Sequence, residues 1–107
     1  MTLSELFNIL NSLDKDIPVA YFCFKKAQNL PYICYLVTDN DGNFMADNKV
    51  YKKISSINIE LYTEDKDIDL EERLEALLDE HKLCYTSNEA YIESEGVFQK
   101  IYTIGVI

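Results

Sequence analysis

Residues 48–80, which read NKVYKKISSINIELYTEDKDIDLEERLEALLDE, contain the two patterns that decide the fold. Apolar and polar residues alternate from Ser56 to Leu61, which is the period of a half-buried strand. Ile57, Ile59 and Leu61 are expected on its buried face. After a short acidic turn the period changes to that of an amphipathic helix. The apolar stripe of this helix is formed by Leu70, Leu74, Leu77 and Leu78.

The limits of this strand and helix follow from their flanking residues. We expect the strand to run from Tyr51 to Thr63 and the helix to begin at Asp67, whose side chain suits an N-cap. The helix should end near His81 or Lys82. Ile54 falls on the opposite parity from Ile57, so the sequence predicts a bulge or a change of environment near Ser55–Ser56.

The remaining elements are arranged around this unit. A helix is expected over residues 2–13, with Thr2 and Glu5 at the spacing of a capping box. Apolar runs predict strands at residues 19–24 and 31–38, the second covered on both faces and therefore central. Residues 83–92 and 97–107 are expected to form a closing hairpin around the turn at residues 93–96.

These elements predict one α+β domain spanning residues 1–107, in the order α-β-β-β-α-β-β. The short links favour a mostly antiparallel sheet of about five strands, with two helices packed on it. A chain of 107 residues is the usual length of a single domain, and its 48% hydrophobic content is that of an ordinary globular protein.

Charge excludes one class of function. The chain carries 19 acidic and 10 basic residues, a net charge of −9, whereas binding to nucleic-acid phosphates requires a clustered basic surface. We therefore expect no sequence-specific nucleic-acid binding. The acidic excess has two interpretations: it provides solubility, or it forms a face that repels DNA and lets it pass.

No pattern in the sequence indicates catalysis or a cofactor. The three glycines lie far apart, so there is no phosphate-binding loop. Asp39–Gly42 departs from the calcium-loop pattern and is typical of a turn. His81 and Cys84 have a zinc-like spacing but lack a second pair of ligands. We therefore predict a protein that is not an enzyme and binds neither metal nor cofactor.

The three cysteines lie in apolar runs and are expected to be buried thiols in a reducing compartment. The first turn lacks the basic segment of a signal peptide, and no apolar run reaches the ~20 residues of a membrane span. Synthesis and folding in the cytoplasm, without a membrane partner, are the resulting expectations.

The long connection at residues 39–49 is the candidate interaction segment. It is longer than a hairpin requires and contains the apolar pair Phe44 and Met45. This pair either folds back onto the domain or contacts a partner. The residues predicted to take part in protein contacts are Phe44, Met45, Asn48, Lys49 and Tyr51.

Four segments and one helix resemble a known family: LPYICY at residues 30–35, ADNKVY at 46–51, IELYT at 59–63, YIESE at 91–95, and the Leu-Glu repeats after Asp67. Over about residues 18–102 the chain resembles the tail-completion proteins of siphophages and prophages of Gram-positive bacteria. These are also called tail-terminator or minor head–tail joining proteins.

The resemblance implies an α+β subunit that assembles as a ring at the head-facing end of the tail tube. Tail-tube and connector proteins would be its partners. It would be found in the host cytoplasm during assembly and then in the virion. The family has no catalytic residues to carry over. The alternative function is a small acidic regulatory or inhibitor domain that binds one cellular protein; an enzyme of another type is a third interpretation.

Overall fold

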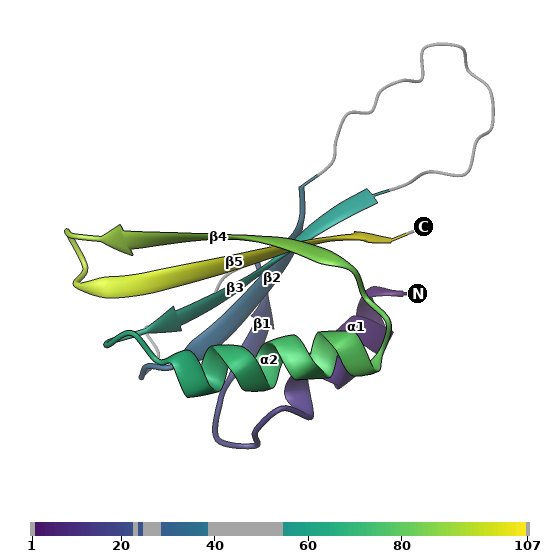
Figure 1. Cartoon of the computed structure of the whole chain (residues 1–107), viewed down its shortest axis with the longest axis horizontal. Helices are drawn as coiled ribbons and strands as arrows, with labels where there is room; N and C mark the ends of the chain where they lie inside the picture. The colour runs from purple at the N-terminus through teal and green to yellow at the C-terminus, as the bar shows by residue number, and fades with distance from the viewer. Residues whose placement is uncertain (1, 23, 25–28, 39–54, 107) are drawn as a thin grey trace, which may run out of the picture.

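The computed structural model describes residues 2–22, 24, 29–38 and 55–106. It is an α+β domain in which two helices lie against one face of a five-stranded sheet (Figure 1). The elements follow in the predicted order. They are α1 (Leu3–Asn11), β1 (Val19–Tyr21), β2 (Tyr32–Val37), β3 (Ser55–Thr63), α2 (Ile68–Glu80), β4 (Tyr85–Ile92) and β5 (Val97–Val106).

The sheet has the strand order β1-β2-β3-β5-β4 and is mixed. Three of its pairings are antiparallel, as expected, but β1 and β2 are parallel, with Val19 beside Ile33 and Tyr21 beside Tyr35. The link between these strands is long enough for the chain to return before it enters β2. β2 is an interior strand, as expected, whereas the middle position belongs to β3.

The alternation that predicted β3 is confirmed by its burial. Ile57, Ile59 and Leu61 are at most 4% exposed, and the residues between them are half-buried. Of the two alternatives predicted near Ser55–Ser56, a bulge is absent from Ser55 onward, because β3 pairs with β5 one to one from Ser55 to Thr63. Ile54, which prompted that prediction, lies outside the described residues.

Both helix starts are confirmed as predicted. The Thr2 hydroxyl accepts from the Glu5 N–H at 3.1 Å, and the Glu5 carboxylate accepts from the Thr2 N–H at 2.8 Å, which completes a capping box. The Asp67 carboxylate accepts from the Leu70 N–H at 3.0 Å. These bonds satisfy backbone N–H groups that the first helical turn leaves without partners.

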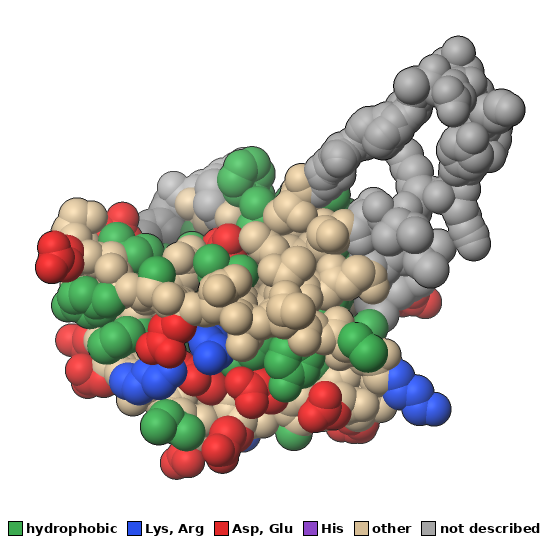
Figure 2. Space-filling model, turned by 45° about the horizontal axis from the view of Figure 1, so that its top comes forward, with side chains coloured by type: hydrophobic (Ala, Val, Ile, Leu, Met, Phe, Trp, Pro, Cys, Tyr) green, Lys and Arg blue, Asp and Glu red, His purple; other side chains and the backbone are tan. Residues whose placement is uncertain are grey.

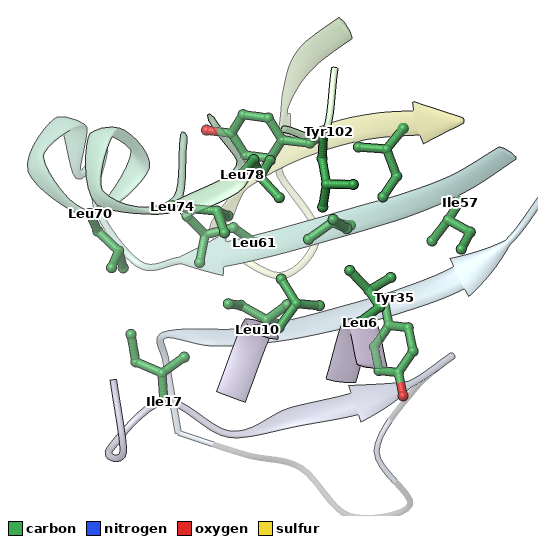
Figure 3. Close-up of a cluster of buried hydrophobic side chains, with 14 residues drawn as sticks. Leu6, Leu10, Ile17, Tyr35, Ile57, Leu61, Leu70, Leu74, Leu78 and Tyr102 are labelled. Atoms are coloured by element: carbon green, nitrogen blue, oxygen red, sulfur yellow. The ribbon is translucent and has the colours of Figure 1, made fainter. Parts of the chain in front are cut away.

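One hydrophobic core lies between the helices and the sheet (Figure 3). α1 contributes Leu6 and Leu10. On α2, Leu70, Leu74 and Leu78 are buried, while Leu77 packs at the margin. Tyr102 of β5 is among the largest fully buried side chains. In the described residues, neither helix is long and apolar enough to cross a membrane.

A group of charged side chains connects the start of α2 to the β4–β5 hairpin. Lys66 Nζ lies 2.9 Å from a carboxylate oxygen of Glu71 and 2.9 Å from one of Glu89. Glu71 is only 6% exposed; Lys66 donates to both of its carboxylate oxygens at 2.9 Å, and Lys100 Nζ is 3.9 Å from Oε1. The hydrogen bond to Glu71 raises the pKa of Lys66, and the hydrogen bond from Lys66 lowers the pKa of Glu89. We call these four residues the Lys66 cluster.

The end of α2 has a residue in an unfavourable conformation. The Leu83 N–H donates to the Leu78 carbonyl at 2.9 Å and the Lys82 N–H to that of Asp79 at 2.9 Å, which is the Schellman arrangement. The residue at the left-handed position, usually glycine, is Lys82, with φ of 60°. The side chain of Lys82 is exposed, so the strain has no compensating burial.

Lys82→Gly is therefore expected to raise the free energy of unfolding by about 1 kcal/mol, because glycine adopts positive φ without a steric penalty. Urea denaturation of both proteins measures the difference. Lys15→Gly, at an exposed position outside the helices, is the control and should not stabilise the protein. A Lys82→Gly variant less stable than wild type would contradict the strain argument.

Candidate interaction surface

The face of the sheet opposite the helices forms the candidate interaction surface. Directly paired residues of neighbouring strands point to the same side of a sheet. The register therefore assigns to this face alternate residues of all five strands. They are Ala20, Tyr32, Cys34, Leu36, Ser56, Asn58, Glu60, Tyr62, Thr86, Asn88, Ala90, Ile92, Val97, Gln99, Ile101, Thr103 and Gly105. We call this set the open sheet face; two of its members, Cys34 and Val97, are themselves buried.

The open sheet face carries almost no charge. Glu60 is its only charged residue, although 27% of the chain is Asp, Glu, Lys or Arg. Depletion of charged residues, with tyrosines among the rest, is typical of the centre of protein–protein interfaces. The solvated face of an antiparallel sheet is usually polar, and here apolar residues such as Leu36, Ile92 and Ile101 are interspersed among the polar ones. The composition of this face therefore makes it the candidate surface for contact with another protein.

Hydrogen bonds within β3 and between β3 and β5 hold the polar side chains of this face. The Tyr62 hydroxyl donates to the Glu60 carboxylate at 2.8 Å and accepts from Gln99 Nε2 at 2.9 Å. Two rows further along the strands, the Thr103 hydroxyl donates to Asn58 Oδ1 at 2.8 Å. Burial, together with the hydrogen bond to Glu60, raises the pKa of Tyr62, which keeps its proton available to the carboxylate. Polar groups paired within the face are less costly to remove from water.

Aromatic rings form one end of the open sheet face. The Tyr32 and Tyr62 rings lie 4.9 Å apart, and the Phe24 ring meets Tyr32 edge-on at 5.4 Å. Burial raises the pKa of Tyr32 as well. Tyrosine side chains combine a large apolar area with few rotatable bonds, which favours them at protein contacts.

Acidic side chains gather on the opposite side of the domain. Exposed carboxylates on the helices and the turn before α2 include Glu5, Glu64, Asp65, Asp69, Glu72, Asp79 and Glu80. Figure 2 shows charged side chains along the lower margin and at the left end, with few in the broad tan area between. The charge of the described residues is therefore distributed unequally between the helix side and the open sheet face.

The interaction residues predicted from the sequence are not placed by the structure. Phe44, Met45, Asn48, Lys49 and Tyr51 all lie outside the described residues. The open sheet face itself was not predicted. Its signal was present in β4, where Thr86, Asn88, Ala90 and Ile92 alternate without a charge, but recognising a common face requires the register between strands.

The prediction of buried cysteines is confirmed for one residue and wrong for another. Cys34 is buried, whereas Cys84 is exposed; Cys23 lies outside the described residues. Cys84 follows Leu83, which enters the core at the end of α2, and precedes Tyr85, which packs at the core margin. Because both neighbours turn inward, Cys84 points outward. Among the described residues, no group of three or more potential metal ligands is present.

Comparisons with known proteins give no family assignment: no family model matches the chain, and a search of curated proteins finds no match either. The fold and the surface define the chain as a two-layer α+β domain. One layer is a sheet with a nearly uncharged outer face, and the other is a pair of helices with an acidic exterior.

Proposed function

We propose that this protein is a structural component of a phage or prophage particle. It completes the tail end or the head–tail junction by forming a ring around the DNA passage. The observation that carries the proposal is the separation of charge between the two layers. The open sheet face has one charged residue, while the helix side is acidic. The resemblance of residues 18–102 to tail-completion proteins supports the same assignment.

The open sheet face has the size and chemistry of a subunit contact. Each strand residue occupies roughly 16 Å² of sheet, so the five strands present roughly 600 Å² before side-chain relief is counted. One partner contributes about 800 Å² to a standard-sized interface. A ring needs one surface of each copy to contact a different surface of the next. The open sheet face supplies one of these two surfaces.

The acidic helix side suits the lining of a DNA passage. Carboxylates such as Glu72 and Glu80 repel phosphates, and interactions between exposed charges persist over about 8 Å at physiological ionic strength. A lining that does not bind DNA lets it move through. In this arrangement the protein contacts tail-tube and connector proteins, assembles in the host cytoplasm and remains in the virion. No bound cofactor and no sequence-specific contact with DNA are required.

Ile101→Arg tests the role of the open sheet face. Ile101 is half-buried at the centre of this face, beside Glu60 and Asn88. Wild-type protein mixed with purified tail tubes should form a species of more than two copies by size-exclusion chromatography with light scattering. The variant should lose this species, because a long charged side chain then projects from the centre of the contact, and removing it from water costs several kcal/mol even beside Glu60.

The matched control is Asn8→Arg, which adds the same charge to the exposed face of α1. It should assemble like wild type, and both variants should keep the wild-type circular dichroism spectrum. A wild-type protein that stays at two copies or fewer, even with tail tubes, would contradict the ring. Assembly that survives Ile101→Arg would exclude the open sheet face as the subunit contact.

A small regulatory domain is the second candidate, because an open face of this size also matches a single partner protein. A regulatory function predicts a one-to-one complex with a cellular protein and no larger assembly. Gene context separates the two functions directly. Capsid, connector and tail-tube genes beside this one favour the ring, whereas their absence favours the regulatory domain.

A further inference from the structure

The outer edge of β4 is a long backbone edge without a partner in the described part of the chain. The strand order places β4 and β1 at the two edges of the sheet. β4 spans eight residues, whereas β1 spans three. An edge strand presents a row of N–H and C=O groups that pair with another strand when one is available.

β4 lacks the features by which proteins usually block such an edge. It contains no proline and no lysine, and its register with β5 continues without a bulge from Tyr85 to Ile92. Its one charged residue, Glu89, has its carboxylate 2.9 Å from Lys66 Nζ, so the charge is compensated inside the same chain. Short length, edge lysines, prolines and bulges are the common protections. β1 has the first of these, since it is short.

We propose that β4 pairs with β4 of a second copy of this chain, antiparallel and about a two-fold axis perpendicular to the sheet. Of the two described edges, only β4 has the length to match β4. The only charged residue of this edge, Glu89, is compensated by Lys66, so the contact brings no uncompensated charges together. This favours association of two chains that each carry a net charge of −9. Antiparallel pairing about this axis leaves all helices on one side and joins the two open sheet faces into one surface.

This contact is independent of the ring. A two-fold contact uses the same surface on both copies and closes at two chains. The ring contact proposed above uses a different surface, the open sheet face. A dimer through β4 can therefore be present or absent whatever the outcome for Ile101→Arg, and different variants test the two contacts.

Ser87→Pro and Asn88→Pro test the pairing. Successive N–H groups of a strand point to opposite sides, so one of these residues donates toward β5 and the other toward the open edge. Analytical ultracentrifugation of wild type should show a monomer–dimer equilibrium. The proline at the outward position should keep the wild-type melting temperature and weaken dimerisation by about tenfold or more, because each copy loses a hydrogen bond. The proline at the inward position should lower the melting temperature.

Hydrogen exchange provides a readout that does not depend on a folded variant. As wild-type concentration rises through the dimerisation range, amides of β4 should become protected while those of β1 stay unchanged. A wild type that remains monomeric at every concentration would overturn the proposal. So would a dimer that keeps its affinity in the fold-preserving proline variant, or β4 amides that gain protection only when a different protein is added.

Discussion

Tyr102→Ala is expected to lower the free energy of unfolding by about 4 kcal/mol, the range for removing a fully buried aromatic side chain. Tyr102 is 0% exposed and lies in the central core, where its ring meets that of Tyr85 edge-on at 5.4 Å. A domain of this length has a total stability of roughly 5–16 kcal/mol. The loss is therefore a large part of the total, and urea denaturation measures it.

Tyr102→Phe separates the ring from its hydroxyl. The hydroxyl donates to a carboxylate oxygen of Glu75 at 2.8 Å, and burial is the main cause of the raised pKa of Tyr102. Removing this hydrogen bond should cost about 1–3 kcal/mol, because it leaves a half-buried acceptor without its donor. Equal losses for the Phe and Ala variants would show that the hydroxyl, and not the packing of the ring, dominates.

Lys66→Met is expected to lower the free energy of unfolding by about 3 kcal/mol, the lower end of the range for breaking a buried ion pair. The substitution leaves the carboxylate of Glu71, 6% exposed, with Lys100 at 3.9 Å as its nearest cation. The lower end applies because one-third of the Lys66 side chain is accessible to water. Chemical denaturation at neutral pH measures the loss.

A second substitution tests the cause of that loss. Lys66→Met combined with Glu71→Met should recover most of the stability, because the stranded charge is removed and two side chains of similar length remain. Lys15→Met, at an exposed lysine, is the control and should change the stability by less than ~0.5 kcal/mol. A double variant as unstable as Lys66→Met alone would show that Lys66 acts through packing and not through the charge of Glu71.

The helices and the central strand could be predicted from the sequence because their signals are local. The capping residues Thr2 and Asp67 form bonds with N–H groups three residues ahead, and the leucine spacing of α2 requires only helical geometry. The alternation at Ile57, Ile59 and Leu61 likewise depends on the period of one strand. The class, α+β with both helices on one face of a five-stranded sheet, followed from the order of these elements.

Features that depend on strand pairing or on which residues enter the core could not be predicted in this way. The parallel alignment of Val19 with Ile33 depends on the path of the chain between them. The exposure of Cys84 depends on which of its neighbours enters the core. The left-handed conformation of Lys82 gives no signal in the sequence, because a lysine there forms the Schellman bonds only when Leu83 is drawn into the core.

The sequence by itself determined the local elements of this protein, their order and its acidic charge. Only the tertiary structure decided that this charge lies mainly on the helix side and that the opposite sheet face is nearly uncharged. It also decided that β4 is a long edge strand with no further strand beside it among the described residues. The physical reason is that the residue pattern of one strand shows only which of its residues share a face. The pairing register between neighbouring strands decides which of these faces lie together on the same side of the sheet. The surfaces on which the proposed contacts rest are formed by that combination.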